Sequence, residues 1–252
     1  MKINFLACDI PFQVVAEDSL RQHTFALLSG YVTEQRPLYT LLMDHRAGNS
    51  LSKDNLDRSI SFDARRDLID FRGFDGQTIK VVLKTCHHEA VSAALGYLLA
   101  AVLPLHDGML LHASAVLGSK GACVFPGKSG AGKSTIAKNS SMTLIHEDRV
   151  AVRRKKDGWV AYGLPMVDND GYPGKNINAP IRMLGLLRKS DHERLIPEKK
   201  RYALEELLQN VVLPKGKGLD PARTSLVCMD LVNDLPVFEV YFKKGSDVAE
   251  LL

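Results

Sequence analysis

Residues 127–134 read Gly-Lys-Ser-Gly-Ala-Gly-Lys-Ser and fit the pattern G-x-x-x-x-G-K-[ST] of a phosphate-binding loop. Glycines in such a loop let successive backbone N–H groups point at one phosphate, and the helix that follows adds the positive end of its dipole. Lys133 would supply a cation for the outer phosphates, and the Ser134 hydroxyl would bind Mg²⁺. The expected phosphate-binding residues are Gly127, Ser129, Gly130, Ala131, Gly132, Lys133, Ser134 and Thr135.

The alternative to a phosphate site is a surface turn rich in glycine and serine. The flanking sequence argues against that alternative. Residues 122–125 are apolar and predict a strand, and residues 134–138 predict the first turn of a helix. Strand, loop and helix in this order are the setting that a phosphate-binding loop requires.

Two carboxylates follow the loop at the end of a second predicted strand, which begins at residues 143–145. Glu147 and Asp148 would suit the metal-binding and general-base part of a nucleotide site. The alternative is an ordinary polar strand end. The loop upstream favours the functional interpretation.

A histidine precedes the loop in another predicted strand, at residues 109–117. Residues 118–121 read Gly-Ser-Lys-Gly, which predicts a hairpin turn into the strand that feeds the loop. Antiparallel pairing would hold His112 at the nucleotide end of the sheet. A lone strand histidine is more often a packed or exposed side chain, so this pairing alone leaves a role for His112 open.

The elements around these residues predict an α/β protein with two parts, residues 1–105 and 106–252. The N-terminal part should be a small α/β or mostly β region that ends in a buried helix over about 88–104. Its other signals are strands at 10–15, 39–43 and 78–83 and turns at 47–50 and 73–76. The second part should contain a hairpin (150–154 and 159–162), a long loop (165–180), a helix (199–213) and strands at 181–187, 227–232 and 237–242.

Composition sets limits on the class of protein. The chain has 252 residues, of which 45% are hydrophobic and 25% charged, so a sizeable core can form. The net charge of +4 suits an anionic ligand such as a nucleotide, and no concentrated basic stripe points to nucleic acid. The apolar window at 90–105 is shorter than a membrane span, and the N-terminus does not read as a secretion signal.

The cysteines and the other candidate metal ligands give no separate site. Cys8, Cys86, Cys123 and Cys228 are widely scattered, which predicts reduced thiols and a cytoplasmic location. The run Cys-His-His-Glu at 86–89 lacks a second ligand cluster for a metal. The aspartates at 168 and 170 resemble a fragment of a calcium loop whose other ligands are missing.

The ordered set of motifs resembles the HPr kinase/phosphorylase-like kinases, which share a fold with phosphoenolpyruvate carboxykinase. The resemblance lies in the histidine strand at 111–116, the loop with residues 125–127, and the acid pair in 144–148. Residues 235–242, and Gly174-Lys175 with Ala179-Pro180-Ile181, also look like HPr-kinase-related proteins of peptide-modification cassettes. The resemblance covers roughly residues 108–245 and implies a P-loop kinase core with a mixed sheet.

The resemblance implies roles for individual residues. Glu147 and Asp148 fill the paired-acid positions, where one polarises the acceptor hydroxyl and the other helps Ser134 to bind Mg²⁺. His112 fits the histidine near the transferred phosphate, and Lys133 completes the catalytic set. Lys175 or Arg182 would meet phosphate or substrate.

The chain departs from the family pattern in two ways. Glu147 replaces the usual first Asp, which extends that carboxylate by about one methylene. No glycine-rich signature follows residue 180, which argues against phosphorylase activity and against HPr as the substrate.

These observations together predict an ATP- and Mg²⁺-dependent kinase that transfers the γ-phosphate to a Ser or Thr hydroxyl of a peptide or small protein, for instance a ribosomally made peptide precursor. Two alternatives stay open: a kinase of a small molecule resembling free serine, and a nucleotide-binding accessory protein without transfer activity. No nucleic-acid or membrane partner is expected, and assembly into a homo-oligomer is left open.

Overall fold

The computed structural model describes residues 1–46, 68–167, 174–213, 216, 219–243, 245 and 247–252. The chain divides into two compact units. Unit 1 consists of Met1–Ala101, Pro165–Asn176 and Pro214–Leu219, and unit 2 consists of Val102–Leu164, Ile177–Leu213 and Asp220–Leu252. The linear division into 1–105 and 106–252 therefore differs from the structure in its boundary and in the two later segments that join unit 1.

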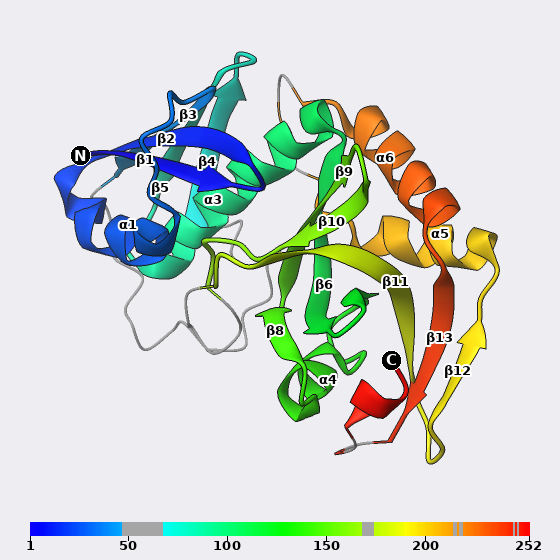
Figure 1. Cartoon of the computed structure of the whole chain (residues 1–252). Coiled ribbons are helices and arrows are strands. Elements are labelled where there is room, and N and C mark those ends of the chain that lie inside the picture. The colour runs from blue at the N-terminus through cyan, green and yellow to red at the C-terminus, as the bar shows by residue number, and fades with distance from the viewer. Residues whose placement is uncertain (47–67, 168–173, 214–215, 217–218, 244, 246) are drawn as a thin grey trace. The chain divides into compact units, whose positions relative to one another are not determined.

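Unit 1 is built on a mixed five-stranded sheet in the order β1-β2-β3-β5-β4 (Figure 1). Strands β2, β3 and β5 run parallel, and β1 and β4 are antiparallel edge strands. Every second residue of β2 is buried, as expected for a strand with one face on a core. The strands are β1 Lys2–Ala7, β2 Ile10–Ala16, β3 Tyr39–His45, β4 Ile69–Phe74 and β5 Thr78–Leu83.

The strands predicted at 10–15, 39–43 and 78–83 are confirmed as β2, β3 and β5. Gly73 and Phe74, which the sequence assigns to a turn, are the last residues of β4, and the bend follows them. The turn predicted at 47–50 lies outside the described residues. The sequence did not predict β1 or the helix α1 Arg21–Leu28.

The buried helix predicted over 88–104 is confirmed as α3 His88–Val102, which continues into a 3-10 turn at Leu103–His106. By length and composition the stretch His88–His106 could cross a membrane, but 83% of its most apolar window is buried within the protein. Pro104 lies in the 3-10 turn, where its missing N–H no longer interrupts an α-helical ladder.

Unit 2 contains a mixed eight-stranded sheet in the order β10-β9-β6-β7-β11-β13-β12, with β8 paired to β6. Because β10 also pairs with β11, five of these strands close into a ring. Strands β7, β11 and β13 are parallel, and the other pairings are antiparallel. The strands are β6 Gly108–Gly118, β7 Gly121–Pro126, β8 Thr143–His146, β9 Arg149–Lys155, β10 Gly158–Tyr162, β11 Asn178–Lys189, β12 Arg194–Pro197 and β13 Val237–Phe242.

Strand β7 is buried on both faces, and its successive residues enter different cores. In β7, Val124 joins a core that includes Ala203 of α5 Lys200–Asn210 and Leu231 of α6 Pro221–Asp234. Its neighbour Phe125 joins a second core with Ile136 of α4 Lys133–Asn139. Helices α5 and α6 lie side by side (Figure 1). Both units are therefore α/β structures with mixed sheets, as the sequence predicts at this coarse level.

One predicted strand is wrong. Residues 227–232 form part of helix α6, although valines make this stretch resemble a strand. The helix has a standard beginning, because the Asp220 side chain accepts a hydrogen bond from the Arg223 amide at 3.2 Å and Pro221 follows it. Thr224, Val227, Cys228, Leu231 and Val232 are its buried residues, with helical spacing.

Candidate functional site

The predicted strand, loop and helix around residues 127–134 are present as β7, a tight loop and α4. Gly130 and Gly132 have φ values of +81° and +106°, which L-residues rarely adopt. Within residues 127–132, only the amides of Gly127 and Ala131 donate to backbone carbonyls of the described chain, namely those of His112 and Lys128. The remaining amides at the loop tip are therefore left for another acceptor.

Lys133 folds back over its own loop. Its Nζ donates to the carbonyl oxygens of Gly127 at 2.6 Å and Lys128 at 3.0 Å, and its side chain is buried. Burial lowers the pKa of the Lys133 ammonium, while the negative charges of Asp148 and Glu147 oppose that shift. The loop cation and the acid pair are therefore electrostatic neighbours, as the sequence predicts.

The acid pair lies in the short connection between β8 and β9. The turn is fixed by His146, whose Nδ1 accepts hydrogen bonds from the amides of Asp148 at 3.3 Å and Arg149 at 3.2 Å. The Asp148 carbonyl accepts a hydrogen bond from the Ala113 amide of β6 at 3.1 Å. These bonds hold the two carboxylates against the strand that carries the predicted histidine.

Asp148 is the centre of a charged group. Its Oδ1 lies 3.0 Å from Nε2 of His112, and its Oδ2 lies 3.4 Å from a guanidinium nitrogen of Arg149. Burial would raise the pKa of the Asp148 carboxyl, but the hydrogen bond from His112 and the charge of Arg149 together hold it well below its usual range. Asp148 is therefore a buried carboxylate that stays ionised at neutral pH.

Glu147 is even less exposed, at 2%, and its Oε1 has no hydrogen-bond partner among the described residues. Nζ of Lys138 lies 3.9 Å from this oxygen. Lys138 is one helical turn after Ser134, so both side chains leave the same face of α4. Glu147 thus lies beside the helix face that carries the predicted metal-binding hydroxyl.

The hairpin that should bring His112 to the loop is confirmed. Ala113 of β6 pairs with Pro126 of β7, and the His112 carbonyl accepts a hydrogen bond from the Gly127 amide at 3.3 Å. The structure thus brings His112, Lys133, Glu147 and Asp148 to one end of β7. Ser134 and Thr135 are partly buried in the first turn of α4, and Ser129 and Gly130 are exposed at the loop tip.

Arg182 is not part of this group. It lies beside the first residues of β7, where its Cβ is close to Gly121, whereas the loop leaves from the other end of that strand. Lys175 belongs to unit 1, and the aspartates at 168 and 170 lie outside the described residues. No cluster of three or more metal-ligating His, Cys, Asp or Glu side chains is found in the described part of the chain, including residues 86–89.

Sequence reasoning missed several residues that shape the site. Arg149 and His146 flank the acid pair directly, so adjacency to Glu147 and Asp148 was the available signal. Arg188, at the loop end of β11, binds Glu206 of α5 and Glu239 of β13, and only the sheet register reveals its place. A scan of this chain against protein-family models and a search of curated proteins found no match.

The site combines three chemical capacities. Loop amides and Lys133 can bind phosphate oxygens. Two buried carboxylates can bind a cation or accept a proton. His112 can hold Asp148 in one orientation or donate toward a phosphate oxygen.

Proposed function

We propose that this protein is an ATP-dependent kinase that transfers a γ-phosphoryl group to a Ser or Thr hydroxyl, most simply on a peptide or small protein in the cytoplasm. The observation that carries the proposal is the contact of 3.0 Å between His112 Nε2 and Asp148 Oδ1. This contact joins the strand before the loop to the acid pair after it. It therefore supports a single site that contains both the loop and the two carboxylates.

The arrangement of strands supports a phosphoenolpyruvate carboxykinase-like core of the HPr-kinase type. The histidine strand β6 runs antiparallel to β7, the loop follows β7, and the acid pair follows β8, which also pairs with β6. A surface turn with the same sequence would not be expected to lie beside two buried carboxylates.

The residues present fit a magnesium nucleotide. Glu147 Oε1 is a buried acceptor without a donor in the described chain, and Asp148 is ionised despite burial, so both favour a cation nearby. Ser134, one turn before the Lys138 that approaches Glu147, adds a hydroxyl oxygen. Bound Mg²⁺ would neutralise charge on the phosphates.

The two carboxylates suit different tasks. Asp148, with its strongly lowered pKa, is a weak base and is suited to remain a charged ligand. Glu147 is the better proton acceptor, because its Oε1 is not occupied by another donor. Glu147 takes the hydroxyl proton while the acceptor oxygen bonds to the γ-phosphorus and the bond from that phosphorus to the β–γ bridging oxygen breaks, releasing ADP. Lys133 offsets the charge on the phosphates.

A pocket of about 440 Å³ beside the loop bears on the size of the acceptor. It is lined by Lys128 and Ala131 of the loop and by exposed side chains of α5 such as Glu205, so it opens to solvent. An open pocket favours a peptide or protein chain over a small molecule that an enzyme would enclose.

The deciding experiment incubates the purified protein with γ-labelled ATP, Mg²⁺ and Ser- and Thr-containing peptides. We expect transfer that falls by at least about 100-fold in Lys133→Ala and in Glu147→Gln, since each removes a group acting on the reacting atoms. Lys156→Ala, at the exposed tip of the β9–β10 hairpin, is the matched control and should keep full activity.

Two outcomes would contradict the proposal. Unchanged ATP binding and transfer in Lys133→Ala would remove the loop from the function. Tight ATP binding with only slow turnover that Glu147→Gln does not alter would instead identify a nucleotide-binding accessory protein.

A further inference from the structure

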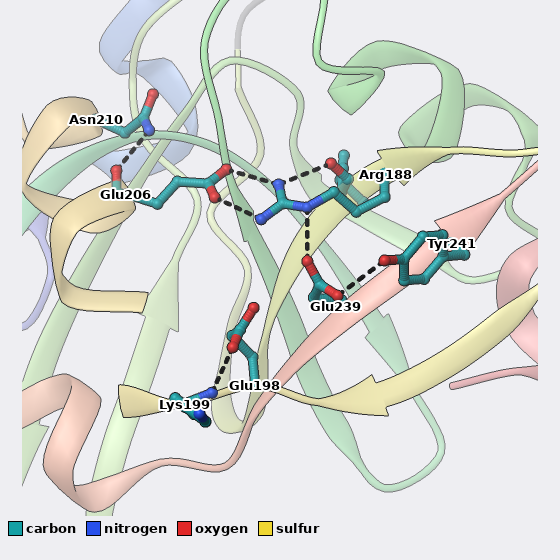
Figure 2. A network of polar contacts seen from close by, with 8 residues as sticks. Arg188, Glu198, Lys199, Glu206, Asn210, Glu239 and Tyr241 are labelled. Carbon is teal, nitrogen blue, oxygen red and sulfur yellow. Dashed lines mark hydrogen bonds and ion pairs between the residues drawn. The ribbon is translucent and has the colours of Figure 1, made fainter. Parts of the chain in front are cut away.

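The pocket beside the loop contains a polar network that the phosphate chemistry does not use (Figure 2). The pocket lies between the loop, the end of β11 and helix α5. Its charged side chains are Lys128 and Arg188 on the positive side and Glu198, Glu205 and Glu206 on the negative side. Its volume of about 440 Å³ is within the range of small-ligand sites.

Arg188 is already committed to two carboxylates. Its Nε donates to Glu239 at 2.9 Å, and its two terminal nitrogens donate to the Glu206 oxygens at 3.3 and 3.0 Å. The Tyr241 hydroxyl donates to the second oxygen of Glu239 at 2.9 Å (Figure 2). One guanidinium thus serves two glutamates, so this group carries a net negative charge and Arg188 is not available for an anionic ligand.

The other glutamates of the pocket are weakly compensated. Glu198 accepts a hydrogen bond from the backbone amide of Lys199 at 2.6 Å. Glu205 is 3.8 Å from Arg201 in an exposed pair within α5, which is worth little in water. Lys128, the second cation of the pocket, belongs to the loop, and a bound phosphate would draw its charge away from the glutamates.

Asn210 gives an independent indication of a ligand. The residue lines the pocket and is only 3% exposed. Its Nδ2 donates to the Glu206 carbonyl at 2.7 Å, but its Oδ1 is buried and has no hydrogen-bond partner among the described residues. A buried amide oxygen without a donor destabilises the folded protein, and a donor on a ligand would remove that cost.

We propose that this pocket binds a positively charged group with several N–H donors, the guanidinium of Arg or the ammonium of Lys, on the phosphoryl acceptor. This inference rests on the proposed function, because it assigns the cation to the molecule that accepts the phosphoryl group. Such a group matches the excess of carboxylates and supplies the donor that Asn210 lacks. A nucleobase fits less well, because it is uncharged and would leave the glutamates uncompensated next to the phosphates.

Binding is tested without nucleotide, so it does not depend on transfer. The probe is a fluorescein-labelled peptide Gly-Ser-Gly-Arg-Gly, compared by fluorescence anisotropy at low salt with the same peptide carrying citrulline, the uncharged isostere, in place of Arg. We expect the Arg peptide to bind at least about 10-fold more tightly, which is the effect of one charge-assisted hydrogen-bonded pair.

The variants locate the binding. Glu198→Gln/Glu205→Gln and, separately, Asn210→Leu should each weaken the Arg peptide by about 10-fold and leave the citrulline peptide unchanged. Asp191→Asn/Glu193→Gln is the matched control, because it removes the same charge from exposed positions before β12 and should have no effect. Competition by free arginine as strong as by the peptide would support the same pocket with a small-molecule acceptor.

Three results would overturn the inference: equal binding of the two peptides, equal weakening by the control pair, or pocket variants that alter nucleotide affinity and not peptide affinity. The last result would make the pocket a nucleobase site. A protein that binds the Arg peptide through these residues but transfers no phosphate would refute the proposed kinase and leave the cation site standing.

Discussion

Asp148 is ionised in a buried position, so the free energy of unfolding depends on pH. An Asp in an unfolded chain titrates near a pKa of about 3.9, and the folded pKa of Asp148 is far lower because of His112 and Arg149. The unfolded chain therefore takes up the proton first as the pH falls. The stabilisation from Asp148 is fully present above about pH 4 and is lost progressively below it.

We expect Asp148→Asn to lower the free energy of unfolding most at pH 6–7 and to differ less from the parent protein as the pH falls below about 4. Denaturant titrations at several pH values would measure this. Asp157→Asn, in an exposed turn, is the control and should follow the parent protein at every pH. A difference between Asp148→Asn and the parent that does not change with pH would contradict the argument.

The two glycines with positive φ in the loop should respond differently to alanine. A Cβ at Gly132 would meet the ring of Phe242 in the core of unit 2, whereas a Cβ at Gly130 would have nothing within 4 Å. Gly130→Ala should cost about 1–2 kcal/mol for the backbone conformation alone, and Gly132→Ala about 2–4 kcal/mol because overpacking adds to it. Equal losses in chemical denaturation would show that packing against Phe242 does not matter.

Single residues of the site were predictable where they belong to a motif and hidden where they do not. The loop residues and the acid pair have a recognisable spacing in the sequence. The Gly-Ser-Lys-Gly turn predicted the antiparallel pairing that brings His112 to the loop. Asn210 and Arg188 carry no such pattern. Their relation to the loop depends on the register of β7 with β11 and on the packing of α5, which are contacts between distant parts of the chain.

At the scale of elements, hairpins with clear turn residues were predicted correctly, and one helix was predicted as a strand. The β6–β7 and β9–β10 hairpins were predicted because their turns carry glycine next to alternating apolar residues. Helix α6 was predicted as a strand over residues 227–232, a stretch that begins and ends with valine. The Asp220-Pro221 start was the signal that could have corrected it, since Asp caps a helix and Pro favours its first turn.

The C-terminus of α6 depends on a lysine from the neighbouring helix. Nζ of Lys200 donates to the carbonyl oxygens of Val232, Asn233 and Leu235 at 2.6, 2.8 and 2.9 Å. A cation at this end satisfies carbonyls without a helical partner and interacts favourably with the helix dipole. Helix α5 thereby fixes where α6 ends and β13 begins.

Lys200→Met should lower the free energy of unfolding by about 1–2 kcal/mol and speed hydrogen exchange in the last turn of α6. Lys199→Met is the control, because it removes the same charge one residue earlier at an exposed position. An equal effect of the two variants would mean that net charge, and not the contact with α6, accounts for the change.

At the scale of the whole molecule, the sequence predicted two parts but not which segments compose them. Pro165–Asn176 and Pro214–Leu219 belong to unit 1 although they lie within the second half of the chain. The amide of Val167 donates to the hydroxyl of Ser92, and Gly216 lies against Phe71. Contacts between residues that are distant in the sequence determine that these two segments join unit 1. Hydrophobic periodicity and turn residues do not predict such contacts.

All the residues proposed to bind nucleotide lie in unit 2, and so does the single tryptophan of the chain. Trp159 is buried in β10, and its Nε1 donates to Asp234 at the end of α6 with a distance of 2.8 Å. Its fluorescence therefore reports the unfolding of the unit that would hold the ligand. A ligand that binds only the folded state stabilises it by mass action, by about 2.7 kcal/mol at 100 times its Kd.

Magnesium ATP at saturating concentration should therefore raise the denaturant midpoint of the Trp159 signal, and inorganic sulfate should reproduce a smaller part of the rise because it occupies only one phosphate position. Lys133→Ala should abolish most of the shift, and Lys156→Ala should retain it. If Lys133→Ala were stabilised as strongly as the parent protein, the nucleotide would bind elsewhere, and the loop of unit 2 would need another explanation for its unused amides and for the two buried carboxylates beside it.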